Sequence, residues 1–148
     1  MKSLKKYFRI SWADRWLLIE AAISLSLVRL ATRLVPFKRL APRLGKPSAA
    51  PEVNLDLVSE TRANRVGWAI NAVAKRTPWK STCLVKSIAA KRILQRRRIP
   101  STLYLGMAKN DLHDLEAHAW LVCGKNFITG EFDHQRYTSL VSFSDHFA

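Results

Sequence analysis

Cysteine, glycine and acidic residues are scarce in this chain of 148 residues, and each shortage excludes a class of protein. The chain has 2 cysteines and 5 glycines, and 11 Asp and Glu residues stand against 25 Lys and Arg residues. Two cysteines without a CxxC pair indicate neither a disulfide framework nor a zinc site. A glycine-rich phosphate loop is also absent from the sequence. We therefore expect no metal and no cofactor, ATP included.

Long apolar runs are missing as well. The most apolar stretch, residues 17–31, contains Glu20 and Arg29 and is shorter than the roughly 20 residues that span a bilayer. The favoured interpretation is a buried helix, while contact of this helix with a membrane surface or a partner stays open, because basic residues follow it. The N-terminus carries no recognisable cleavable signal, so we expect a cytoplasmic protein with reduced thiols.

Positive charge is concentrated in the first 108 residues. They carry 22 basic and 5 acidic side chains, whereas residues 109–148 carry 3 and 6. Such a field attracts nucleic acid, anionic lipid or acidic peptides, and a solvated surface explains it equally well. The run Arg96-Arg97-Arg98 matches the negative end of a helix dipole, which is the favoured explanation. We expect no nucleic-acid partner.

Hydrophobic periodicity predicts an α+β fold in which helices precede a small sheet. A helix is predicted from Ser11, which can cap it, to about Leu34. The other predicted elements are helices over 37–44, 55–76 and 83–98 and strands over 102–107, 117–123, 126–132 and 137–143. We divide the chain into an N-terminal helical segment (1–46), a linker (47–54) and a core (55–148), together forming one compact domain.

Cys83 has the sequence context of a reactive thiol. It follows Ser81 and Thr82, which favour the N-cap position, and it precedes a long run without Gly or Pro. Cys83 should therefore lie in the first turn of a helix, where the helix dipole stabilises a thiolate. Its own backbone N–H is then a natural oxyanion donor, and the second donor cannot be named from the sequence.

His118 lies in a segment that alternates like a strand. His118, Trp120 and Val122 share one face, and Gly124-Lys125 reads as the tight turn of a hairpin. A two-residue turn pairs Trp120 with Thr129 and His118 with Glu131. A shift of one residue would bring Gly130 or Phe132 opposite His118 instead.

Two carboxylates compete for the place beside His118. The hairpin register favours Glu131, whereas a bulge at Gly130 would let Asp133 take its place. If neither serves, the next candidates lie in the segment 109–116, which we predict to be a loop over the active cleft. These candidates are Asp111, Asp114 and Glu116.

A cysteine at a helix start, a histidine on the next strand and an acid on the strand after that is the order found in transglutaminase-like and papain-like thiol enzymes. More narrowly, the chain resembles the short stand-alone leader peptidases of lasso-peptide biosynthesis over nearly its whole length. The shared motifs are Pro78-Trp79 with Cys83-Leu84, Lys91-Arg92-Ile93-Leu94 with Ile99-Pro100, Leu105-Gly106, Ala117-His118-Ala119-Trp120, Gly130 and Tyr137-Thr138. Two positions depart from the family pattern: Arg98 replaces a frequent glycine and Val122 a frequent glutamate.

The resemblance implies a transglutaminase-like core and a function. The enzyme would remove the leader from a ribosomal precursor peptide, with Cys83 as nucleophile, His118 as base and Glu131 or Asp133 as orienting acid. It also implies a separate PqqD-like recognition protein that holds the leader, and a separate ATP-dependent cyclase that closes the ring.

Two other functions stay open. One is a basic adaptor for nucleic acid or membrane in which Cys83 and His118 are inert, since a single cysteine or histidine is most often structural. The other is acyl or amine transfer by the same three residues. Cys123, on the strand face opposite His118, is predicted to be a core residue.

Overall fold

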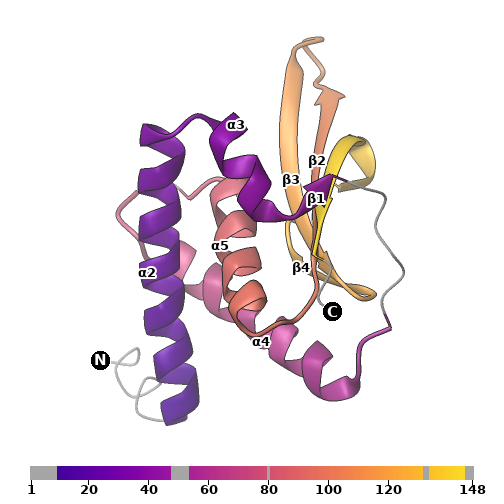
Figure 1. The fold of residues 1–148 in the computed structure, drawn as a ribbon. Helices are drawn as coiled ribbons and strands as arrows, with labels where there is room; N and C mark the ends of the chain where they lie inside the picture. The colour runs from indigo at the N-terminus through magenta and orange to yellow at the C-terminus, as the bar shows by residue number, and fades with distance from the viewer. Residues whose placement is uncertain (1–9, 48–53, 80, 132–133, 146–148) are drawn as a thin grey trace.

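The computed structural model describes residues 10–47, 54–79, 81–131 and 134–145. Helices occupy the first two thirds of the chain and a sheet the last third, so the predicted α+β class is confirmed (Figure 1). The helices are α2 (Trp12–Leu34), α3 (Phe37–Leu40), α4 (Leu57–Ala74) and α5 (Cys83–Arg96), with 3₁₀ turns η1 (Ala41–Leu44) and η2 (His134–Arg136). The strands are β1 (Lys46–Pro47), β2 (Thr102–Lys109), β3 (Leu115–Cys123), β4 (Asn126–Thr129) and β5 (Thr138–Ser144).

Helix α2 begins where the sequence predicts. The hydroxyl of Ser11 accepts a hydrogen bond from the backbone N–H of Asp14 at 3.2 Å, which caps the helix. The helix buries Leu17, Leu25 and other residues of one face and packs against α4 and α5. None of the described helices has a stretch long and apolar enough to cross a membrane.

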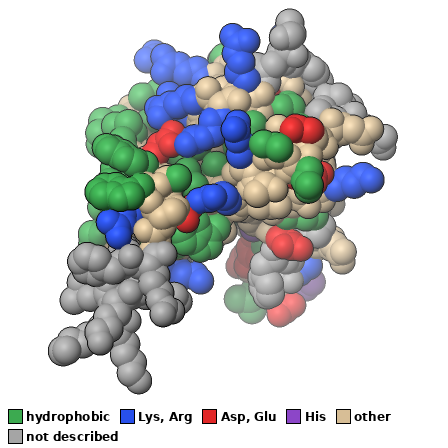
Figure 2. Space-filling view, turned by 90° about the horizontal axis from the view of Figure 1, so that it is seen from below, with side chains coloured by type: hydrophobic (Ala, Val, Ile, Leu, Met, Phe, Trp, Pro, Cys, Tyr) green, Lys and Arg blue, Asp and Glu red, His purple; other side chains and the backbone are tan. Residues whose placement is uncertain are grey.

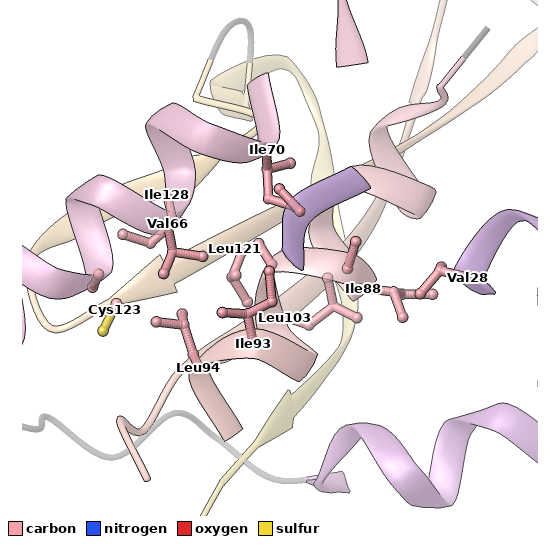
Figure 3. Packing of buried hydrophobic residues seen from close by; sticks show 14 of the residues in the cluster. Val28, Val66, Ile70, Ile88, Ile93, Leu94, Leu103, Leu121, Cys123 and Ile128 are labelled. Atoms are coloured by element: carbon pink, nitrogen blue, oxygen red, sulfur yellow. The ribbon is translucent and has the colours of Figure 1, made fainter. Parts of the chain in front are cut away.

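Helix α5 lies at the centre of the molecule between α2, α4 and the sheet (Figure 1). Apolar residues on several of its faces are buried, as expected for a helix with neighbours on several sides. Figure 3 shows side chains from all these layers meeting around it. The labelled members are Val28, Val66, Ile70, Ile88, Ile93, Leu94, Leu103, Leu121, Cys123 and Ile128.

Helix α5 ends in a tight reversal at Arg98. Arg98 has a φ of +53°, which lies in the left-handed region that favours glycine. The chain reverses here because the N–H of Ile99 bonds back to the carbonyl of Leu94 at 3.0 Å. A glycine would adopt this conformation without strain, whereas Arg98 adopts it at a cost.

The strands form one antiparallel sheet in the order β1-β5-β2-β3-β4. Strand β1 pairs Lys46 with Ser144 and Pro47 with Phe143, so a short edge strand occupies the start of the predicted linker. Residues 48–53 of that linker lie outside the described residues. Helices α4 and α5 pack on one face of the sheet.

The predicted loop over residues 109–116 is shorter than expected, because only residues 110–114 lie outside the strands. Strand β2 continues to Lys109 and β3 already begins at Leu115, with the two residues paired. A tight turn joins them, in which the side-chain oxygen of Asn110 accepts from the N–H groups of Leu112 and Asp114 at 2.9 Å each. The polar composition of the segment therefore reflects a hairpin tip rather than a long lid.

The hairpin β3–β4 has the predicted turn but only part of the predicted register. Cys123 pairs with Asn126 and Val122 with Phe127, yet Thr129 pairs with Leu121 and not with Trp120. The extra residue is Ile128, which forms a bulge. Because of this bulge, Ile128 and Thr129 are both buried, at 5% and 3% exposure, although they are consecutive.

Candidate functional site

Cys83 is the first residue of α5, as predicted. The hydroxyl of Thr82 accepts from the N–H of Val85 at 3.3 Å and so caps the helix. Cys83 is half-buried and packs against the hydrophobic core, and its thiol is free. The thiol is therefore carried by the first turn of the helix, at the positive end of the helix dipole.

The position of Cys83 along the sheet follows from Ser87, one turn further down the same helix face. The hydroxyl of Ser87 lies 2.7 Å from that of Thr129 and 3.5 Å from the carbonyl oxygen of Ala119. One helical turn covers about 5.4 Å, or less than two residues of a strand. Cys83 therefore lies about one helical turn from the level of Ala119 and Thr129.

His118 is half-buried in β3 and is fixed on several sides. Its Nε2 lies 2.9 Å from the carbonyl oxygen of Gly130. The imidazole stacks on Trp120 with ring centroids 5.8 Å apart, and it lies 4.8 Å from the ring of Tyr137. Since a carbonyl only accepts, Nε2 must carry a proton, and in the neutral ring Nδ1 then holds the free lone pair.

The structure places His118 on the face of β3 that points away from the helix bearing Cys83. Ala119, Leu121 and Cys123 face the core beneath the helices, and strand alternation puts His118 on the opposite face with Trp120. Among the described residues, no hydrogen bond joins Cys83 to His118.

The end of β4 contacts residues on both faces of the sheet. Thr129 contacts Ser87 of α5, and the next residue, Gly130, contacts His118. The end of β4 thus contacts both the helix that bears Cys83 and the imidazole of His118.

Gly130 is required at this edge by its conformation and by space. Its φ is +73°, and a Cβ atom there would meet the carbonyl oxygen of Ala119 at 2.5 Å and the Cα of Trp120 at 2.9 Å. Any side chain would force β3 and β4 apart and move the carbonyl that holds His118.

The predicted carboxylates occupy different positions. Glu131 is exposed directly after Gly130 and lies beyond the end of the ladder, so the predicted pairing with His118 is not part of β4. The bulge at Ile128 is the physical reason, because it shifts every later residue by one position. Asp133 lies outside the described residues.

Glu116 is the reserve candidate nearest to His118 along the chain. It precedes His118 by two residues on the same strand, and it accepts from the hydroxyl of Tyr137 at 3.4 Å. The ring of Tyr137 in turn packs on His118. Asp111 and Asp114 lie in the turn between β2 and β3.

A cavity of about 250 Å³ adjoins this edge, and the sequence reasoning missed it. It lies between α4 and β4, and both Thr129 and Gly130 belong to its wall. The other lining residues are Asn64, Gly67, Trp68, Asn71, Phe127, Ile128 and Glu131. The cavity could have been found from the spacing of Asn64, Trp68 and Asn71, which places two carboxamides and an indole on one helix face.

Cys123 is a core residue, as the alternation predicts. Its side chain has 0% exposure, and its thiol donates to the carbonyl oxygen of Pro100 at 3.2 Å. Burial raises the pKa of the Cys123 thiol to about 11. At neutral pH this thiol is protonated and unreactive.

Within the described part of the chain, no group of three or more His, Cys, Asp or Glu side chains is placed to hold a metal ion.

Residues 24–142 match the family model described as the transglutaminase-like superfamily. The match covers most of the chain, and the chain belongs to this superfamily. No curated protein and no solved structure gives a significant match. The family agrees with the predicted fold, in which a central helix that begins with a cysteine packs on a small antiparallel sheet.

Proposed function

We propose that this protein is a cysteine peptidase that removes the leader from a ribosomally made lasso-peptide precursor. The observation that carries the proposal is Cys83 at the capped start of the central helix α5 in a transglutaminase-like domain. The superfamily includes cysteine peptidases, and the motifs around both residues resemble those of lasso-peptide leader peptidases.

The reaction begins when His118 takes the proton of the Cys83 thiol and the resulting thiolate attacks the carbonyl carbon of the scissile peptide bond. A C–S bond forms, the oxyanion accepts a hydrogen bond from the backbone N–H of Cys83, and the C–N bond then breaks. The imidazolium of His118 gives its proton to the leaving amine. His118 next takes a proton from water, which attacks the thioester and releases the acid product and the thiolate.

The carbonyl of Gly130 gives His118 the tautomer that this role needs. It holds the proton on Nε2 and leaves Nδ1 as the base. Within the residues that the structure describes, no hydrogen bond joins the thiol to the imidazole, so this role requires them to come together when the substrate binds. Catalytic hydrogen bonds often tighten in this way when the substrate arrives. The negative charge of Glu131 or Asp133 then stabilises the imidazolium.

The cavity between α4 and β4 supplies a binding place for the peptide beside the scissile bond. The side chains of Asn64 and Asn71 make no hydrogen bond with the residues that the structure describes, and each offers a donor and an acceptor to a peptide backbone. Trp68 is 45% exposed and forms an apolar wall between them.

The precursor's leader is held by a separate PqqD-like recognition protein, and the product passes to an ATP-dependent cyclase. Tethering through the recognition protein raises the local substrate concentration. Cleavage by the isolated chain should therefore be slow and should rise when that partner is added. A cleavage rate that does not change when the partner is added would contradict a role of the recognition protein in holding the leader.

The direct test of function compares Cys83→Ala with Cys123→Ala on precursor cleavage, read by mass spectrometry. Cys83→Ala should abolish cleavage and Cys123→Ala should retain most of it, with both variants folded by circular dichroism. Equal loss in both would exclude Cys83 as the single nucleophile. A leader product whose mass equals that of the carboxylic acid plus an amine minus one water would show transfer instead.

A further inference from the structure

Helix α2 exposes a continuous apolar stripe along its whole length. The members lie three or four positions apart, which places them on one face. They are Trp12, Trp16, Ile19, Ile23, Leu27, Leu30 and Leu34. Their exposed fractions run from 50% for Ile19 to 72% for Trp12 and Leu34. At 1.5 Å per residue the helix is about 34 Å long, and an apolar patch of this extent marks an interaction surface.

Arginines flank the stripe on one side. Arg15, Arg29 and Arg33 each directly precede a stripe residue, which places them about 100° round the helix from it. The guanidinium of Arg15 lies over the ring of Trp12, 5.1 Å from its centroid. Figure 2 shows hydrophobic side chains gathered on the α2 side of the molecule with Lys and Arg side chains around them.

The two carboxylates of α2 are both paired and do not oppose an anionic partner. Asp14 forms an ion pair with Arg65 of α4. Glu20 accepts from Arg97 of α5 at 2.7 Å and lies 3.7 Å from Arg96. Arg96 and Arg97 therefore stand on the other side of the stripe, so that cations border it on both flanks.

We propose that this stripe docks the protein on an anionic lipid bilayer, with α2 lying in the plane of the membrane surface. An apolar face bordered by arginines matches a surface that offers acyl chains between negative headgroups. A second copy of the chain fits less well, because two stripes packed face to face would bring the flanking arginines of both copies together. His118 is on the sheet, on the far side of α5 from α2, so docking would leave it in solution.

The test is flotation of the full chain with vesicles of phosphatidylcholine alone and of phosphatidylcholine with phosphatidylglycerol. The chain should float with the anionic vesicles, and binding should weaken as salt is raised. Ile23→Ser with Leu27→Ser should weaken binding by about tenfold or more, and Arg33→Gln by a smaller factor. Leu112→Ser with Leu140→Ser is the matched control, because both residues are exposed apolar side chains away from α2. This control should bind normally.

Three outcomes would overturn the proposal. One is no binding to anionic vesicles, and another is binding that the α2 double variant leaves unchanged. The third is a dimer in light scattering that only the α2 double variant abolishes, because it would assign the stripe to a second copy. The test does not depend on peptidase activity.

Discussion

At the scale of single residues, the partner of His118 is a backbone carbonyl. The carbonyl of Gly130 fixes the proton on Nε2, but it carries no full charge with which to stabilise an imidazolium. A carboxylate nearby would then contribute charge and not orientation.

If the Gly130 carbonyl orients His118 and a carboxylate adds only charge, removing the carboxylate should lower the rate modestly. Glu131→Gln should lower kcat by about tenfold, because the tautomer survives and only the charge stabilisation is lost. The measurement is precursor cleavage by Glu131→Gln and Asp133→Asn side by side. A thousandfold loss in either variant would mean that its carboxylate, and not the Gly130 carbonyl, orients His118 during turnover.

The sequence predicts the roles of single residues well where these roles depend on neighbours in the chain. Ser11 and Thr82 were expected near helix starts, and both cap helices through their hydroxyls. The buried state of Cys123 followed from alternation alone. The contact between His118 and Gly130 was not predictable, because a backbone carbonyl leaves no trace in the residue pattern.

At the scale of elements, the limit of sequence reasoning is the end of β4. Period-two alternation allows Ile128 or Thr129 to face the core, but not both. Both are buried, because Ile128 packs against Gly67 of α4 and Thr129 bonds Ser87 of α5. A Cβ on Gly67 would meet the carbonyl oxygen of Ile128 at 2.6 Å, so close approach of helix and strand depends on this glycine. The bulge results from packing on two helices at once.

The same pair of elements forms the cavity, which leads to a prediction about substrate binding. Asn71→Ala should raise KM for the precursor about threefold to tenfold and leave kcat nearly unchanged, because one hydrogen bond to bound peptide is lost. Asn54→Ala, an exposed amide before α4, serves as the control. Unchanged KM in Asn71→Ala would exclude this side chain from peptide binding.

At the scale of the whole molecule, one buried ion pair joins the helical layer to the sheet. The Nζ of Lys91 in α5 lies 2.7 Å from the carboxylate of Asp145 and donates to the carbonyl of Ser101 at 2.7 Å. Lys91 has 0% exposure, and burial lowers the pKa of its amine. Gln95 also donates to Asp145, at 2.8 Å. The start of β2 and the end of β5 are thereby fixed to the central helix.

Removing one partner of this pair should destabilise the fold strongly. Asp145→Asn leaves a buried amine without its counter-charge and should lower the free energy of unfolding by about 3–5 kcal/mol in urea denaturation followed by circular dichroism. Glu20→Gln, which breaks the more exposed pair with Arg97, should cost less than about 1 kcal/mol. Equal losses in the two variants would contradict the structural role of Lys91 and Asp145.

The fold as a whole was predictable because hydrophobic periodicity separates helices from strands and Cys83 begins the central helix. The exposed face of α2 was harder to predict, since the same apolar run fits a buried helix. Burial of one face against α4 and α5 leaves the other face in solvent, and only the packing of three helices decides which residues belong to each.

The central claim is that Cys83 is an activated nucleophile with His118 as its base. It is tested most directly by the rate at which iodoacetamide alkylates Cys83 in the native chain near neutral pH, mapped by mass spectrometry. The rate should exceed that of Cys83 in the urea-unfolded chain and should fall in His118→Gln, whose amide can still donate to Gly130 but cannot accept the proton. Cys123 should stay unmodified, because burial raises its pKa to about 11. A native rate no faster than the unfolded one, and unchanged in His118→Gln, would show that Cys83 is an ordinary core thiol.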